Sequence, residues 1–110
     1  MIPAAPCITA LVTAPDIETA RKIAQAALTQ KLAACANIIP NLESHYWWQS
    51  KLEQSGEVLI IFKTTTKMQI ALRDCVLANH PYETPEFITQ SIDFGNGAYL
   101  TWIRQNVAIV

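Results

Sequence analysis

Close cysteine pairs and glycine-rich stretches are the first things this sequence lacks. It has three glycines and three widely spaced cysteines, Cys7, Cys35 and Cys75. Zinc-finger and dithiol redox motifs need neighbouring thiols, so both are excluded. Each cysteine lies in an apolar run, which predicts a small buried residue. Because 51% of the 110 residues are hydrophobic, we expect residues 1–110 to form one domain that needs no disulfide or structural metal.

Strong charge of one sign is also missing. The formal net charge is −1, and the eight Lys and Arg residues are scattered along the chain. A nucleic-acid-binding surface normally needs a basic stripe, so nucleic acid is not an expected partner. Charged residues interrupt every long apolar run well before it could span a bilayer. We therefore expect a cytoplasmic protein without a membrane partner.

Sequence motifs of catalysis are missing as well. The chain has no G-x-S-x-G, P-loop, H-E-x-x-H or G-x-G-x-x-G pattern. A small phosphate-processing enzyme of the acylphosphatase type needs Arg and Gly after its first strand, where this chain has Thr13-Ala14-Pro15-Asp16. We expect no catalytic residues, no enzymatic activity and no required cofactor.

The first two-thirds of the chain alternates between apolar runs and turn signals. These patterns predict a strand over 7–14, an amphipathic helix over 16–31, an apolar strand over 32–39 that Pro40-Asn41 ends or kinks, and an aromatic β segment over 42–49. A turn over 49–51, a second turn or bulge signal at 54–56, and the strongest strand over 57–64 follow.

The last third predicts one helix, one strand and a further helix. Thr66 and Gln69 fit a capping box, and apolar spacing continues the helix over 68–79 until Pro81 stops it. A strand over 86–93 and a helix over 98–105 complete the order βαββαβα. We predict an α+β, ferredoxin-like βαββαβ sandwich with an added C-terminal helix and a long hairpin between its second and third strands. The first and third strands should be central, with two helices on one face.

Large apolar side chains are too numerous for one covered sheet face. Neighbouring residues on a strand point to opposite faces, so Trp47 and Trp48 cannot both face the helices. The run 58–62 also places bulky groups on both faces. A lone two-layer domain would expose that surface to water, which soluble monomers avoid. We therefore predict a homo-oligomer, with the hairpin projecting towards a neighbouring subunit.

The stretch NHPYETPE, residues 79–86, combines an imidazole, a phenol and two carboxylates with two prolines. His80 is its only imidazole, and metal sites usually need at least two such ligands on one surface. A histidine at a helix end more often binds terminal carbonyls, so a stiff connection is the favoured interpretation. A small-molecule pocket that includes Lys63 and Glu86 among aromatic side chains remains open.

Several ordered motifs resemble the CutA family of divalent-cation tolerance proteins. They run from Thr13 to about Arg104 and read TAPD, KLAACANIIP, SHYWWQSKLEQSGEV, IFKTT, HPYETPE and YLTWI. The resemblance implies a ferredoxin-like homotrimer associated with tolerance to copper and other divalent ions. It also implies a copper site of one Cys and a His-His pair. Here the Cys position is Val12 and the first His position is Asn79, so only His80 matches.

The resemblance leaves three functional hypotheses. In the first, a metal-response protein binds a divalent metal or copper weakly, with His80, Glu57 and Glu86 as candidate ligands, because the thiolate and one imidazole are replaced. The second is a trimeric small-molecule sensor similar in architecture to PII signalling proteins. Its pocket would lie between subunits and use Lys63, Tyr82, Glu86 and Trp48. The third is a non-catalytic trimeric scaffold.

Overall fold

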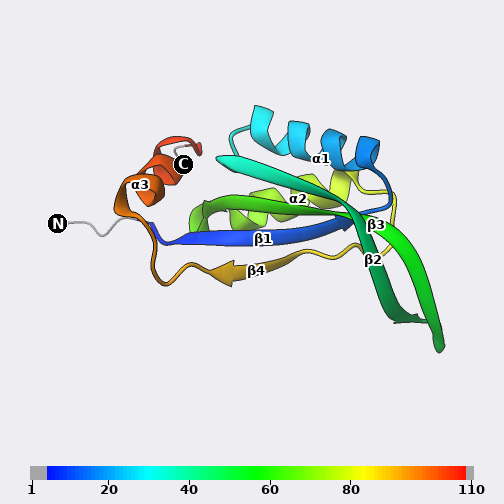
Figure 1. Cartoon of the computed structure of the whole chain (residues 1–110). Coiled ribbons are helices and arrows are strands. Elements are labelled where there is room, and N and C mark those ends of the chain that lie inside the picture. Colours follow the sequence, from blue (N-terminus) through cyan, green and yellow to red (C-terminus); the bar gives the residue numbers. More distant parts are fainter. Residues whose placement is uncertain (1–4, 109–110) are drawn as a thin grey trace.

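The computed structural model describes residues 5–108 and contains four strands, three α-helices and one short 3₁₀ turn within that range. Figure 1 shows the elements in chain order. Their bounds are β1 Cys7–Ala14, α1 Ile17–Thr29, β2 Cys35–Trp48, β3 Lys51–Thr65, the 3₁₀ turn Thr66–Met68, α2 Gln69–Asn79, β4 Ile88–Ser91 and α3 Gly97–Gln105.

The four strands form one antiparallel sheet in the order β2-β3-β1-β4. The central position of β1 and β3 confirms the ferredoxin-like prediction. Helices α1 and α2 lie side by side on one face of the sheet (Figure 1). The added helix α3 lies at the end of the sheet where β1 begins, and the Cys7 thiol there contacts the Leu100 carbonyl oxygen at 3.7 Å.

The hydrophobic core lies between the sheet and the two helices. Val12 of β1 and Ile60 and Phe62 of β3 are fully buried, and they pack with Ile23 of α1 and Leu72 of α2. Ile60 and Phe62 are two residues apart on β3, and Val12 lies directly opposite Ile60, so all three share the helix-covered face. Burying five such side chains stabilises the fold by roughly 1.5–3 kcal/mol each.

The hairpin of β2 and β3 is longer and more continuous than predicted. Residues 54–56 were expected to form a turn or a bulge. Gln54, Ser55 and Gly56 instead pair without a register shift with His45, Ser44 and Glu43 of β2, so that prediction is wrong. The hydrogen bonds of the partner strand keep this segment extended despite its glycine. The hairpin reverses at Gln49-Ser50, where both φ angles are positive.

Pro40-Asn41 kinks β2 without ending it. The register shifts between Ile39 and Leu42, so two residues of β2 lie opposite one residue of β3, as in a β-bulge. Asn41 has φ 64°, a left-handed conformation that Asn tolerates. Beyond the bulge the hairpin extends away from the rest of the sheet (Figure 1).

Helix α1 has a well-defined start and end. The Asp16 carboxylate accepts a 2.8 Å hydrogen bond from the Thr19 amide, and this contact lowers the pKa of Asp16. At the other end Lys31 has φ 57°, and the Leu32 amide donates to the Ala27 carbonyl at 3.0 Å. This Schellman ending turns the chain before the strand begins, so β2 starts three residues later than predicted.

The predicted capping box is wrong. Thr66 lies inside a 3₁₀ turn, and neither the residue before that turn nor the residue before α2 makes a side-chain capping bond. The chain tightens directly out of β3, where the Thr66 amide donates instead to the Pro6 carbonyl at 3.0 Å. Strand β4 is also shorter than predicted, because only Ile88–Ser91 pairs with β1.

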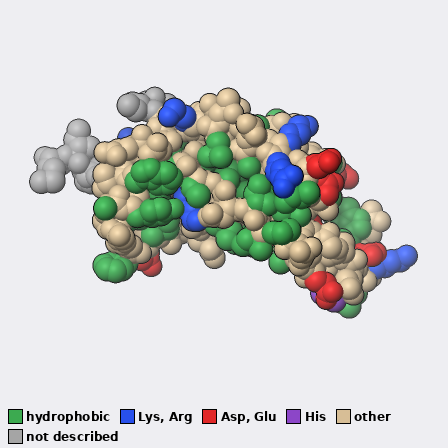
Figure 2. Space-filling model, turned by 45° about the horizontal axis from the view of Figure 1, so that its top comes forward, with side chains coloured by type: hydrophobic (Ala, Val, Ile, Leu, Met, Phe, Trp, Pro, Cys, Tyr) green, Lys and Arg blue, Asp and Glu red, His purple; other side chains and the backbone are tan. Residues whose placement is uncertain are grey.

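The sheet face opposite α1 and α2 carries apolar side chains, as predicted. Leu59 and Ile61 are half-buried there, while Ile88 of β4 is 51% exposed. On the hairpin, Trp47 is 73% exposed and Trp48 46%. On the helical side, basic groups are dispersed rather than gathered in a stripe (Figure 2). Among the described residues no helix is long and apolar enough to cross a membrane.

Candidate functional site

The connection between α2 and β4 forms the candidate site. Helix α2 ends at Asn79, and His80 is already extended with ψ 136°, as expected before Pro81. The Asn79 amide group donates to the Cys75 carbonyl at 2.8 Å and so caps its own helix. We predicted that His80 would bind such terminal carbonyls; among the described contacts Asn79 does so instead.

Both ring nitrogens of His80 have partners. Nε2 lies 2.7 Å from the Thr13 carbonyl oxygen at the end of β1, and Nδ1 accepts a 3.1 Å hydrogen bond from the Tyr82 amide. A carbonyl can only accept, so Nε2 carries the hydrogen and Nδ1 the lone pair. In this conformation neither nitrogen offers a lone pair to a metal.

Tyr82 links the connection to β3. Its hydroxyl donates a 3.1 Å hydrogen bond to the Glu57 carboxylate, which is only 9% exposed. Burial first, and then the charge and hydrogen bond of Glu57, raise the pKa of Tyr82 to about 12. Tyr46 and Asp16 make smaller electrostatic contributions to that rise. The hydrogen bond to Glu57 therefore ties this phenol to β3.

Glu86 completes the group. Glu86 is an exposed residue like Glu83, yet partial loss of water raises the pKa of Glu86, and the charge of Glu57 raises it further. Two carboxylates that repel each other favour protonation of one of them or the arrival of a cation. The sequence-predicted residues Glu57, Tyr82 and Glu86 are thus brought together, and we call these three the Glu57–Glu86 cluster; His80 lies beside it, against Tyr82.

Lys63 lies elsewhere on the sheet. It is six residues from Glu57 along the same extended strand, a separation of roughly 20 Å. It is paired across the ladder with Cys35, and its ammonium group donates to the Asn37 side chain. The pKa of Tyr99 is raised by burial and then by the adjacent Cys35 thiol. Within one subunit Lys63 and Glu86 therefore do not line one pocket.

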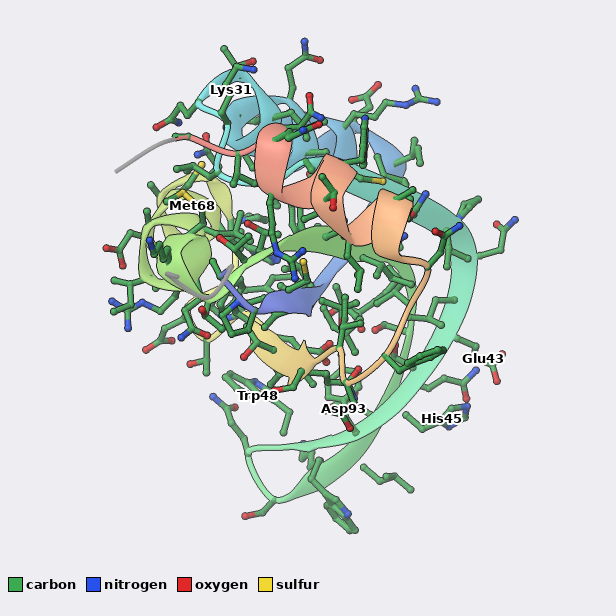
Figure 3. All side chains as sticks on the ribbon, turned by 90° about the vertical axis from the view of Figure 1, so that its left-hand side faces the viewer. Lys31, Glu43, His45, Trp48, Met68 and Asp93 are labelled. Carbon is green, nitrogen blue, oxygen red and sulfur yellow. The ribbon has the colours of Figure 1, made fainter. Side chains whose placement is uncertain are left out.

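Trp48 is also distant from the cluster, because it pairs with Lys51 next to the hairpin turn. The second histidine, His45, lies on the same arm, where its Nε2 is 2.8 Å from the Glu43 carboxylate. Figure 3 shows Glu43 and His45 together on the curved strand β2, on the side away from Met68. The structure thus separates the predicted pocket residues into three places: the cluster, Lys63 and the hairpin arm.

The copper constellation implied by the resemblance has no counterpart around His80. Val12 is fully buried on the helix-covered side of β1, and the Asn79 amide is bonded to its own helix. Among residues 5–108 no three His, Cys, Asp or Glu side chains form a group that could hold a metal ion. The oxygen atoms of Glu57, Glu86 and Tyr82 instead suit a hard divalent cation.

Two shallow hollows adjoin α1. One of about 480 Å³ is lined by Arg21, Lys22, Gln25, Ala26, Thr29 and Gln30. The other, of about 310 Å³, lies between α1 and β2. None of the candidate residues lines either hollow.

Comparison with known proteins decides the family. Residues 8–106 match the family model of the CutA1 divalent ion tolerance protein. This chain belongs to the CutA1 family. It is 44% identical over 100 residues to the divalent-cation tolerance protein CutA of Salmonella newport, and the match covers 91% of this chain and 87% of that relative.

Solved CutA1 structures share the fold throughout. The divalent cation tolerance protein of Thermus thermophilus superposes with a TM-score of 0.91 and 42% identity, covering 93% of this chain and 99% of that one. CutA1 from Oryza sativa gives 0.92 and 40%, covering 96% of each chain. The stable CutA1 of a psychrotrophic Shewanella bacterium gives 0.89 and 39%, covering 96% and 98%. The whole ferredoxin-like layout, hairpin included, is therefore that of the CutA1 family.

The sequence did not reveal three contacts of the candidate residues. The Thr13 carbonyl accepts a hydrogen bond from His80, the Asn37 side chain accepts one from Lys63, and Cys35 lies opposite Lys63 on β2. Aligning the two long strands from the turn at Gln49 would place Cys35 opposite Thr64. The bulge at Pro40-Asn41 shifts the register and makes Lys63 its partner. The Thr13 contact had no sequence signal, since a backbone carbonyl carries none.

Proposed function

We propose that this chain is a non-enzymatic, cytoplasmic divalent-cation tolerance protein that works as a homotrimer and binds a divalent cation weakly between Glu57 and Glu86. Two facts support the cation class: the names of its CutA relatives and the oxygen-only donor set of the cluster. The proposal requires no resident cofactor.

The effect of Glu57 on Glu86 is what supports this proposal. The Glu57 charge adds to the rise in the pKa of Glu86, so ionising both carboxylates together is unfavourable. A divalent cation would neutralise both charges. Mg²⁺ and Mn²⁺ are commonly held by one or two carboxylates together with water. With only two protein carboxylates, the expected affinity is low.

Copper is the less suitable ion for this cluster. Soft thiolate and free imidazole favour copper, whereas Val12 provides no ligand atom and both nitrogens of His80 are engaged. We therefore expect Cu²⁺ to bind no more specifically than a hard cation at these residues.

The uncovered sheet face supports the homotrimer. That face exposes Ile39 and Ile88 at 44% and 51%, and the hairpin arm exposes Trp47 and Leu52 at 73% and 65%. Exposed apolar surface of this kind marks contacts with other chains, and aromatic residues are enriched in such contacts. We propose that other copies of this chain cover the exposed apolar surface, because each copy carries both an arm and sheet edges that can pair with it.

Calorimetric titration of untagged protein with Mn²⁺ and with Cu²⁺ tests the cation proposal. We expect weak Mn²⁺ binding with a fixed stoichiometry, lost in Glu86→Gln. Glu83→Gln is the matched control, because Glu83 is an exposed carboxylate of the same connection. Wild-type protein that binds no divalent cation would refute the proposal. Submicromolar copper binding that His80→Ala abolishes would contradict the choice of cation and of ligands.

A second candidate function is small-molecule sensing at Lys63. Within the described part of the chain its ammonium group has no carboxylate at ion-pair distance. It donates to Asn37, Cys35 lies opposite it on β2, and Tyr99 lies next to Cys35. An anionic metabolite would complement that charge. A thermal-shift screen of metabolites should then give a stabilisation that Lys63→Ala removes and Glu86→Gln retains.

A further inference from the structure

His80 links the connection between α2 and β4 to the end of β1. Its Nε2–H donates to the Thr13 carbonyl at the end of β1, at 2.7 Å, and its Nδ1 accepts from the Tyr82 amide at 3.1 Å. Its ring also packs against the Tyr82 ring, with centroids 4.7 Å apart and planes tilted by 51°. Two of these contacts therefore fix Tyr82 relative to His80, and one fixes His80 relative to the sheet.

The chain of contacts continues into the Glu57–Glu86 cluster. The Tyr82 hydroxyl donates to Glu57 at 3.1 Å. Thr13 of β1 and Glu57 of β3 belong to paired strands, because Ala14 lies opposite Val58. The links from Thr13 through His80 and Tyr82 to Glu57 thus form a closed loop that starts and ends on the rigid sheet.

We propose that His80 is a positioning residue: it holds the Tyr82 phenol on Glu57 and thereby sets the geometry of the Glu57–Glu86 cluster, without being a ligand itself. The effect on cation binding rests on the proposed function above. The positioning of Tyr82 does not, and it can be measured without metal.

This closed series of contacts explains how the His80 side chain sets the position of the Tyr82 hydroxyl on Glu57. The connection from His80 to Phe87 has no regular secondary structure, so its backbone amides are not held by a ladder of hydrogen bonds. Without the imidazole, the Tyr82 amide loses its acceptor and the phenol loses its neighbouring ring. A hydrogen bond of this kind contributes about 1 kcal/mol, which corresponds to roughly a fivefold change in an equilibrium constant.

Three substitutions separate the two nitrogens. In His80→Asn the side-chain oxygen reaches about as far as Nδ1 and can still accept from Tyr82. In His80→Gln the amide reaches about as far as Nε2 and can still donate to Thr13. His80→Ala removes both contacts. His45→Ala is the matched control, because His45 is an exposed histidine on the hairpin arm, hydrogen-bonded to Glu43.

The first measurement is the ¹³Cζ resonance of Tyr82 in metal-free protein labelled at tyrosine, assigned by its loss in Tyr82→Phe. We expect His80→Ala to move the resonance towards that of a solvent-exposed phenol. His80→Asn should keep it close to wild type, and His45→Ala should leave it unchanged. An unmoved resonance in a folded His80→Ala protein would overturn the proposal; if that variant does not fold, a Tyr82 shift as large in His80→Asn as in His80→Gln would overturn it.

The second measurement is Mn²⁺ affinity by calorimetry. We expect it to fall about fivefold in His80→Ala, with recovery in His80→Asn. Complete loss of binding in all three variants, with the Tyr82 resonance unmoved, would show that His80 is a ligand and would overturn the proposal. If wild-type protein binds no Mn²⁺, the proposed function fails, and the positioning role is then decided by the resonance alone.

Discussion

The Tyr82 hydroxyl and the Glu57 carboxylate are joined by a 3.1 Å hydrogen bond between residues 25 apart in the sequence. The bond fastens an irregular connection to the central strand β3. Because Glu57 is only 9% exposed, the phenol replaces water that the carboxylate has lost on burial. The energetic consequences of this pair can be measured directly.

Removing the Tyr82 hydroxyl should destabilise the fold. Tyr82→Phe keeps the ring against His80 but leaves the buried Glu57 carboxylate without its donor, which costs about 1–3 kcal/mol. Urea unfolding at a fixed protein concentration measures the change. Tyr46→Phe is the control, because its hydroxyl bonds to Ser55 on the exposed hairpin arm. Equal effects of the two substitutions would contradict the role of burial.

Glu86→Gln should stabilise the protein at neutral pH. Burial and the Glu57 charge raise the pKa of Glu86 above its ordinary value of 4.5, so the folded chain binds its proton more tightly than the unfolded chain does. Stability therefore falls as pH rises from 4.5 through the raised pKa. The advantage of Glu86→Gln should be full above that pKa and shrink towards pH 4.5.

Unfolding measured across this pH range, with Glu83→Gln alongside, checks the Glu86 prediction. Glu83 is exposed in the same connection, so its replacement controls for the loss of one negative charge. A Glu86→Gln protein less stable than wild type at neutral pH would contradict repulsion between the two carboxylates.

Lys31→Gly should stabilise the end of α1. Lys31 has φ 57° in the Schellman ending, a conformation that costs a residue with a side chain about 1 kcal/mol and costs glycine almost nothing. We expect the free energy of unfolding, measured by heat or urea, to rise by roughly 0.5–1 kcal/mol. Lys22→Gly, in the interior of the same helix, should instead lower the free energy of unfolding by about 1 kcal/mol. A loss in both would show that the left-handed ending carries no strain.

Light scattering at micromolar concentration should give three times the chain mass of 12.2 kDa. Trp47→Lys, on the hairpin arm at 73% exposure, should shift the distribution towards smaller species because it places a charge in an apolar contact. The control Ile70→Lys changes an apolar residue that is 62% exposed on α2. A wild-type monomer would refute the trimer.

Much of the fold followed from local patterns. The bounds of β1 were predicted to the residue, and α1 and α2 within about two residues, because apolar spacing and Pro81 act locally. Errors arose where a neighbouring strand supplied the hydrogen bonds. Ser55-Gly56 reads as a turn in isolation, yet β2 keeps it extended. Thr66 reads as a cap, but the chain leaves β3 through a tighter turn.

The candidate site was only partly predictable. Glu57, Tyr82 and Glu86 were all named from the sequence, and the structure brings them together. Lys63 was grouped with them because residue type was the only guide, whereas the extended geometry of β3 carries it roughly 20 Å away. Trp48 was misplaced for the same reason, since the long arm removes it from the body of the sheet.

The sequence by itself determined the order of elements and the excess of apolar surface, and it puts Val12 and Asn79 where the family resemblance implies copper ligands. These are properties of residue type and spacing, which need no partner to be expressed. Only the tertiary structure decided the role of His80. The partners of its two nitrogens are a backbone carbonyl of β1 and a backbone amide two residues away, and backbone groups are identical in every sequence. Folding alone places them, and it turns a candidate ligand into a link between strand and connection.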